Sequence, residues 1–335
     1  MAIEIKGSAS AIPSRRVTND ELPKDLDTSD EWIRSHTGIG ARHISDTGVA
    51  SSDLALEAAK KALAMAYPDL SEAALSIDMI VLATATPDYY GSPATACIVQ
   101  DKLGAKNAGA MDITAGCTGF IYALETAAGL LSINDRKRVL VIGADVLTKF
   151  ADWTDRSSCV LFGDGAGAVI LEKTPDTGEN GKRGLFRTIL RADGSGANHI
   201  MFKRGGSRNP FTAGETLENP IQIEMNGQAV YNFAVKAMTE IITDILFKEG
   251  ISIDDVSWII PHQANARIVR AAAKRLKIPE GKCFLNVEEY ANTSAASIPI
   301  ALDELNRGGN LKTGDLILTV GFGSGLTYGA NLIMW

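Results

Sequence analysis

Short apolar runs alternate with helical patterns along the chain. Four of these runs, rich in Val, Ile and Leu, begin at Asp78, Met111, Arg138 and Ala166, and each has the composition of a buried strand. Buried strands that alternate with helices are typical of an α/β protein with a largely parallel sheet. The pattern therefore predicts an α/β architecture.

The second half of the chain repeats the first in outline. A polar segment rich in turn formers, residues 173–184, lies near the middle, and we place a boundary within it. The strand at Ile80 precedes a small-residue turn at Cys117, and the strand at Trp258 precedes a similar turn at Asn292; a helix and a strand follow each turn. We therefore predict an internal duplication of residues 1–178 and 179–335.

This duplication predicts where the chemistry lies. Two packed copies of one unit bring their strand-to-helix junctions to a common centre, and open α/β sheets bind ligands at such junctions. Cys117 and Asn292 occupy equivalent turns, and His262 follows the apolar strand from Val256. The sequence thus predicts that Cys117, His262 and Asn292 are neighbours.

Cys117 has the surroundings of a nucleophile. It lies between Gly116 and Gly119, where a strand ends and a helix begins, as in a nucleophile elbow. The free N–H groups of the helix are expected to lower the pKa of its thiol. The alternative is a buried structural cysteine, which we assign to the other three cysteines because they lie in apolar patterns: Cys97, Cys159 and Cys283.

His262 and Asn292 also have simpler interpretations. A histidine that opens a helix can be merely solvated, and asparagine is a common helix cap. The equivalence of Asn292 with Cys117 in the repeat favours a functional role. Two glycine-rich runs, 163–167 and 321–325, match neither GxGxxG nor GxxxxGK[ST], the patterns of phosphate-binding loops. Both lead into strands, so we interpret them as tight turns.

Composition excludes several classes of protein. The 335 residues are 45% apolar and 22% charged, enough for roughly two domain-sized units. The net charge of −7 argues against general affinity for nucleic acid or anionic membrane. Neither a signal peptide nor a long apolar span is present, which predicts a cytoplasmic protein. Cysteine and histidine spacings match no metal site.

Motifs along nearly the whole length resemble one family. The chain is similar to the 3-oxoacyl-[acyl-carrier-protein] synthase III enzymes of the thiolase superfamily in runs that begin at Asp30, Asp112, Phe162, Pro261, Asn292 and Phe322. The resemblance implies a thiolase-like five-layer αβαβα fold and a homodimer. It also implies condensation of an acyl-CoA primer with malonyl-[acyl carrier protein], which starts fatty acid synthesis without a cofactor.

The resemblance also assigns the catalytic roles. Cys117 is expected to take the acyl group, while the backbone N–H groups of Cys117 and Ser324 hold the oxyanion. His262 and Asn292 would donate hydrogen bonds to the malonyl thioester carbonyl while CO2 leaves. The turn at 321–325 lacks the second cysteine that thiolases use there, which favours decarboxylation over thiolysis.

For the substrates, the resemblance implies three further sets of residues. The coenzyme A set has Trp32 and Arg156 around the adenine and Asn265 beside the pantetheine, with weaker matches at Gly227 and Arg267. His36 and Gln228 depart from the family pattern, which commonly has Arg and Asn there. The primer-pocket set is Ser92 and Phe322. Relatives often have a bulky residue at position 92, so a primer larger than acetyl is expected.

The carrier-protein set forms a basic stripe on one predicted helix. Arg267, Arg270, Lys274 and Lys277 share a helical face, and Arg275 lies beside it. Carrier protein is acidic, so we expect this face to bind it; the alternative is a merely solvated face.

Three other functions remain open. One is a condensing enzyme of secondary metabolism that uses a non-malonyl acceptor. Another is a hydrolase that uses Cys, His and Asn, which the repeat and the motif contexts disfavour. The third is a non-catalytic acyl-binding or nucleotide-binding module, which the glycine runs suggest.

Overall fold

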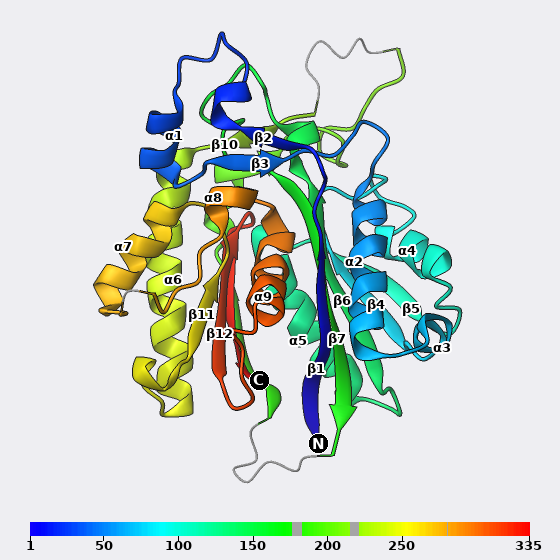
Figure 1. Cartoon of the computed structure of the whole chain (residues 1–335). Helices are drawn as coiled ribbons and strands as arrows, with labels where there is room; N and C mark the ends of the chain where they lie inside the picture. Colours follow the sequence, from blue (N-terminus) through cyan, green and yellow to red (C-terminus); the bar gives the residue numbers. More distant parts are fainter. Residues whose placement is uncertain (176–182, 215–220, 280) are drawn as a thin grey trace.

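A computed structural model describes residues 1–175, 183–214, 221–279 and 281–335. It confirms the predicted α/β class, with helices packed around a nine-stranded sheet (Figure 1). The strands are β1 (Ala2–Ala11), β2 (Arg16–Thr18), β3 (Ala41–His43), β4 (Met79–Ala83), β5 (Gly109–Ile113), β6 (Arg138–Val146), β7 (Asp164–Thr174), β8 (Gly184–Ala192), β9 (Ile200–Phe202), β10 (Ile223–Met225), β11 (Trp258–Pro261), β12 (Leu316–Gly323) and β13 (Thr327–Met334). The α-helices are α1 (Asp30–Thr37), α2 (Ser51–Ala66), α3 (Leu70–Leu75), α4 (Thr95–Leu103), α5 (Gly119–Ser132), α6 (Gly227–Glu249), α7 (Ala266–Leu276), α8 (Val287–Tyr290) and α9 (Ser297–Arg307).

The large sheet contains the same series of strand pairings twice. Its order is β11-β12-β13-β8-β1-β7-β6-β4-β5. In one half, β4 runs parallel to β6, β6 antiparallel to β7, and β7 antiparallel to β1. In the other half, β11, β12, β13 and β8 repeat these orientations, and β1 joins β8 in parallel. Two copies of one unit would pair in this way. The boundary predicted at residues 178 and 179 lies outside the described residues and stays a prediction.

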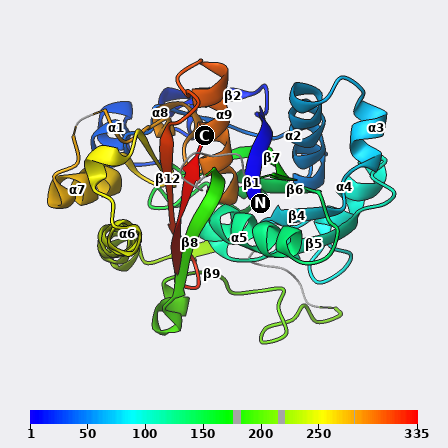
Figure 2. The ribbon, with the colours of Figure 1, turned by 90° about the horizontal axis from the view of Figure 1, so that it is seen from below.

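Helices cover both outer faces of this sheet and fill the space between its halves. Figures 1 and 2 show α2, α3 and α4 outside one half and α6 and α7 outside the other, with α5 and α9 between them. The central helix α5 is apolar on most sides because it packs against both halves. This arrangement gives the five layers of a thiolase fold.

The two halves meet most closely where small residues allow it. A Cβ added at Gly143 of β6 would lie 2.3 Å from the carbonyl oxygen of Ala295, and one added at Gly323 of β12 would lie 2.6 Å from the backbone nitrogen of Cys117. Backbone from each half therefore touches the other at the level of the two predicted functional turns. The close packing depends on these two glycines, because any side chain at either position would collide with the opposing backbone.

Substitution of Gly143 tests this packing. We expect Gly143→Ala to lower the free energy of unfolding by about 1–3 kcal/mol because its methyl group would collide with fixed backbone. Gly129→Ala is the matched control, since Gly129 is helical with open space around it; there alanine should stabilise the protein by about 0.5–1 kcal/mol. Chemical denaturation measures both, and equal effects would contradict the predicted contact.

Candidate active site

Cys117 lies in the sharp turn that the sequence predicts. The turn is a single 3-10 turn, η2 (Gly116–Thr118), between β5 and α5. Gly116 has a φ of 52°, and a Cβ there would lie 2.1 Å from Ser324 Oγ, so both conformation and space require glycine. This places the Ser324 segment directly beside the Cys117 turn, as an oxyanion site would need.

The electrostatic surroundings of Cys117 differ from the expected ones. The thiol is hydrogen-bonded by the side chain of Ser294, but burial, reinforced by the nearby carboxylate of Asp145, raises its pKa to about 12. The expectation that the helix N-terminus lowers this pKa is therefore wrong, because desolvation of the thiolate dominates. The free enzyme holds Cys117 as a neutral thiol.

Among the other cysteines, Cys159 is buried, as a structural cysteine would be, and Cys283 is partly buried. Cys97 is exposed on α4, so the prediction of a buried role is wrong for it; its side of that short helix faces outward.

Asp145 is a fully buried carboxylate behind the thiol. Its Oδ1 accepts hydrogen bonds from the backbone N–H groups of Ala85 and Thr86 at 2.8 and 3.0 Å, and from the hydroxyls of Thr84 and Thr86. Its Oδ2 accepts the N–H of Ala295 at 3.1 Å. Burial raises the pKa of Asp145, and these donors oppose that rise. Asp145 therefore ties the Asn292 turn to β4 and β6.

His262 is a buried, neutral imidazole. It follows β11, its backbone N–H donates to the carbonyl of Val320 at 2.7 Å, and its ring packs edge-on against Phe322. Burial lowers the pKa of His262 to about 3, so the ring is uncharged at neutral pH. The helix predicted to open at His262 begins only at Ala266, because Asn265 caps it.

Asn292 is held by its own turn. Its side-chain Oδ1 accepts the backbone N–H of Ser294 at 2.9 Å, which leaves the amide NH2 as the group that a ligand can contact. Ala291 and Ser294 on either side have φ of 55° and 51°. Non-glycine residues adopt this region rarely, and such strained residues tend to cluster at functional sites.

A cavity of about 170 Å³ brings the three predicted catalytic residues together. Cys117, His262 and Asn292 all line it, together with Phe322 and Gly323. Gly227 and Asn265 from the predicted coenzyme A set line the same cavity. Asn265 also connects two helices, since its Nδ2 donates to the carbonyl of His36 at 3.1 Å. A thioester that reaches Cys117 through this cavity would pass Asn265.

The proposed adenine pair is in direct contact. The Arg156 guanidinium lies 5.1 Å from the centre of the Trp32 ring, and it hydrogen-bonds Asp27. His36 stacks on Trp32 with ring centres 4.3 Å apart. A planar base between Trp32 and Arg156 needs about 7 Å, two van der Waals contacts of ~3.5 Å. Arg156 must therefore move outward before it can sandwich an adenine.

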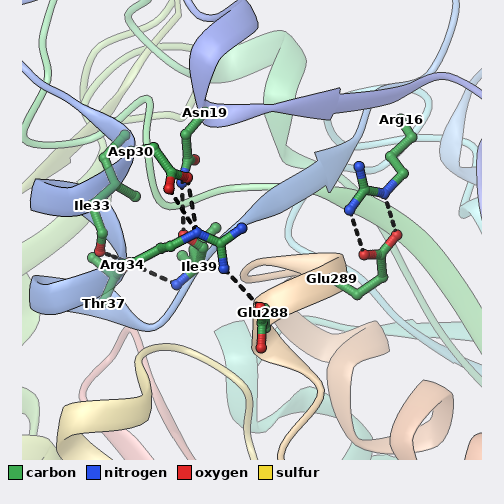
Figure 3. Close-up of polar contacts among 9 residues, drawn as sticks. All are labelled: Arg16, Asn19, Asp30, Ile33, Arg34, Thr37, Ile39, Glu288 and Glu289. Carbon is green, nitrogen blue, oxygen red and sulfur yellow. Dashed lines mark hydrogen bonds and ion pairs between the residues drawn. The ribbon is translucent and has the colours of Figure 1, made fainter.

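Ion pairs fasten the α1 segment to the turn of Asn292. Figure 3 shows Arg34 bridging Asp30 and Glu288, and Arg16 forming two hydrogen bonds with Glu289. Both glutamates belong to α8, which ends just before Ala291. The segment that carries Trp32 is thus connected to the Asn292 turn.

A second, smaller cavity is also lined by Cys117. It has a volume of about 40 Å³ and an apolar lining that includes Leu147, Phe162, Phe202 and Ile223. Phe322, one of the predicted primer residues, lies instead in the larger cavity against His262, and Ser92 is exposed and lines neither cavity. The lining residues outside any motif, such as Phe202, gave no sequence signal beyond their hydrophobicity.

The remaining predicted residues lie on the surface. The basic residues of α7 and its C-cap are all exposed, and none forms an ion pair with any residue that the structure describes: Arg267, Arg270, Lys274, Arg275 and Lys277. Gln228 donates to the side chain of Asn232 on its own helix.

Within the described ranges, no helix is long and apolar enough to cross a membrane, and no cluster of metal-ligating residues occurs.

Comparison with known proteins identifies the class. Residues 111–194 match the 3-oxoacyl-[acyl-carrier-protein] synthase III family, and residues 246–335 match its C-terminal part. A beta-ketoacyl-[acyl-carrier-protein] synthase III from Caldanaerobacter subterraneus is 47% identical over 100% of this chain and 98% of its own length.

Two solved structures show the same relationship. A synthase III from Aquifex aeolicus VF5 has a TM-score of 0.89 and 42% identity, with both chains covered completely. The priming beta-ketosynthase of the R1128 polyketide pathway has a TM-score of 0.87 and 30% identity over 99% of this chain and 96% of its own. The chain belongs to the 3-oxoacyl-[acyl-carrier-protein] synthase III family of condensing acyltransferases.

Alkylation measures the state of the thiol. Because burial raises the pKa of Cys117 to about 12, the thiolate fraction should rise about tenfold per pH unit through neutral pH. We expect the rate at which iodoacetamide alkylates Cys117, measured by peptide mass, to rise from pH 7 to pH 10 without reaching a plateau. Exposed Cys97 serves as the internal reference for the reagent. A plateau below pH 8 would show a thiolate in the free enzyme.

Proposed function

We propose that this enzyme condenses an acyl-CoA primer with malonyl-[acyl carrier protein] and so initiates fatty acid synthesis. The products are 3-oxoacyl-[acyl carrier protein], coenzyme A and CO2. The observation that carries the proposal is the cavity that holds one thiol, Cys117, and two uncharged hydrogen-bond donors, His262 and Asn292. No cofactor enters the scheme, since coenzyme A is part of the substrate.

The first half-reaction acylates Cys117. Its sulfur attacks the primer thioester, the tetrahedral oxyanion is held by the N–H groups of Cys117 and Ser324, and coenzyme A leaves. Because the thiol starts neutral, its proton departs with the sulfur of coenzyme A, and the step is balanced without a net proton change. The small apolar cavity beside Cys117 would receive the acyl chain.

The second half-reaction forms the carbon–carbon bond. The malonyl thioester loses CO2, and negative charge develops on its carbonyl oxygen, where His262 and Asn292 donate hydrogen bonds. The resulting carbanion attacks the acyl group on Cys117. The sulfur leaves, and one proton from solvent restores the thiol. Neutral donors suit this step because they hold the charge without first giving up a proton.

The hydrogen bonds disfavour a hydrolase of the papain type. In such an enzyme the asparagine orients the histidine, which activates the cysteine. Here the Oδ1 of Asn292 accepts the N–H of Ser294, and His262 Nδ1 meets Ser297 instead. A condensing enzyme of secondary metabolism remains the alternative, favoured by the likeness to the polyketide priming synthase. An assay with malonyl-[acyl carrier protein] separates the two.

Substitutions should separate the half-reactions. Asn292→Ala should still form acyl-enzyme but lose CO2 release by on the order of 10² to 10³, because one donor to the developing charge is missing. Cys117→Ala is the reciprocal variant: it cannot be acylated but keeps both donors, so slow decarboxylation should persist. Intact mass measures acylation and radiolabelled CO2 measures decarboxylation. Loss of acylation in Asn292→Ala would contradict this division.

The unpaired basic face of α7 is the proposed docking surface for the carrier protein. Charge reversal at Lys274 and Arg275 should raise KM for malonyl-[acyl carrier protein] by about tenfold, most clearly at low salt, while acylation by acyl-CoA stays unchanged. The control is charge reversal at two exposed lysines elsewhere, Lys60 on α2 and Lys106 just after α4, which should leave KM unchanged. Equal effects of the two pairs would count against docking at α7. The homodimer implied by the resemblance stays a prediction.

A further inference from the structure

The hydroxyl of Ser297 touches the catalytic imidazole from behind. Ser297 is the first residue of α9 and is 2% exposed, and its Oγ lies 2.7 Å from His262 Nδ1. The same oxygen accepts the backbone N–H of Gln263 at 3.4 Å. Ser297 therefore engages Nδ1, which leaves Nε2 as the nitrogen of this cavity-lining ring that a substrate can contact.

These two contacts determine which atom carries the proton. A hydroxyl has one proton to donate and two lone pairs that accept. The N–H of Gln263 can only donate, so it occupies a lone pair of Oγ. Among the described residues, the structure gives Ser297 Oγ no acceptor other than His262 Nδ1. The hydroxyl is therefore the hydrogen-bond donor to Nδ1, and Nδ1 then carries no proton of its own.

The neighbouring groups hold this arrangement in place. The side chain of Gln263 donates to the carbonyls of Pro261 and Phe284 and accepts the N–H of Asn286 at 3.0 Å, which fixes the segment that presents its N–H to Ser297. The ring of His262 is held at its other edge by Phe322. The N–H of Gln263 and the ring of His262, the two groups that contact the Ser297 hydroxyl, are therefore both held in position.

We propose that Ser297 is a positioning residue that donates to His262 Nδ1 and thereby directs the Nε2–H into the catalytic cavity. The inference deepens the proposed function, on which it rests: it makes His262 a hydrogen-bond donor to the malonyl carbonyl before any substrate binds. A carboxylate in place of this hydroxyl would accept a hydrogen bond from Nδ1–H and leave Nε2 unprotonated as a base, as in hydrolytic triads. Ser297 thus selects the donor form of the same ring.

The tautomer can be observed directly in the free enzyme. The chain has four histidines, so 15N labelling of histidine gives few signals, and His262→Ala identifies those of His262. We expect a protonated Nε2 and an unprotonated, hydrogen-bonded Nδ1 in the wild type. A protonated Nδ1 in the wild type would overturn the proposal, whatever the variants do.

Variants then connect the tautomer to the reaction. Ser297→Ala should lower CO2 release by on the order of 10-fold to 100-fold through loss of ring orientation, with acylation of Cys117 nearly intact, and Ser297→Thr should restore both the nitrogen signals and the rate. Ser52→Ala is the matched control, since the buried Ser52 hydroxyl on α2 has no hydrogen-bond partner among the described residues; its signals and rate should not change. Equal losses in Ser297→Ala and Ser52→Ala would overturn the proposal. Failure of the wild type to decarboxylate malonyl-[acyl carrier protein] would instead refute the proposed function, because the nitrogen signals do not depend on it.

Discussion

The carboxylate of Asp145 is the contact on which the active site depends. It lies at the end of β6 and accepts N–H groups from Ala85 and Thr86 in one half of the sheet and from Ala295 in the other. A buried carboxylate needs such donors, since burial without them costs several kcal/mol. The same bonds that satisfy Asp145 therefore hold the Asn292 turn against the Cys117 turn. Gly143 makes the approach possible because any side chain there would reach the Ala295 carbonyl.

Burial at this junction also determines the charge state of the site. It raises the pKa of Cys117 and lowers that of His262, so both groups are neutral in the free enzyme. An ion pair of thiolate and imidazolium, which would activate the cysteine toward many electrophiles, is thus disfavoured. Neutral groups suit a reaction in which charge appears only transiently, on the thioester oxygens. The site is electrostatically arranged for the transition states rather than for the resting thiol.

The sequence predicted the α/β class and the three polar residues that line the central cavity beside one another, Cys117, His262 and Asn292, because both predictions depend on local patterns. Glycines around Cys117 and the repeated strand-turn-helix order were sufficient to place Cys117, His262 and Asn292 together. The pKa of the thiol was predicted in the wrong direction, since the depth of burial follows from packing of distant segments. Asp145 gave no signal because it ends an apolar strand, and Ser297 because its partner lies 35 residues away. Trp32 and Arg156 were expected to lie on either side of an adenine, but in the structure the two side chains contact each other and leave no gap for a base.

The same three residue types can serve opposite reactions, and their hydrogen bonds decide between them. A thiol, an imidazole and a carboxamide hydrolyse peptides when the carboxamide orients the imidazole as a base for the thiol. In this chain the carboxamide oxygen is bound within its own turn. In the proposed tautomer the imidazole Nδ1 accepts a hydrogen bond from the Ser297 hydroxyl of α9, so both side chains present N–H groups to the cavity. Donors of this kind stabilise an enolate but remove no proton from a nucleophile. The chemistry of the site thus follows from the hydrogen bonds that Ser294 and Ser297 make to Asn292 and His262.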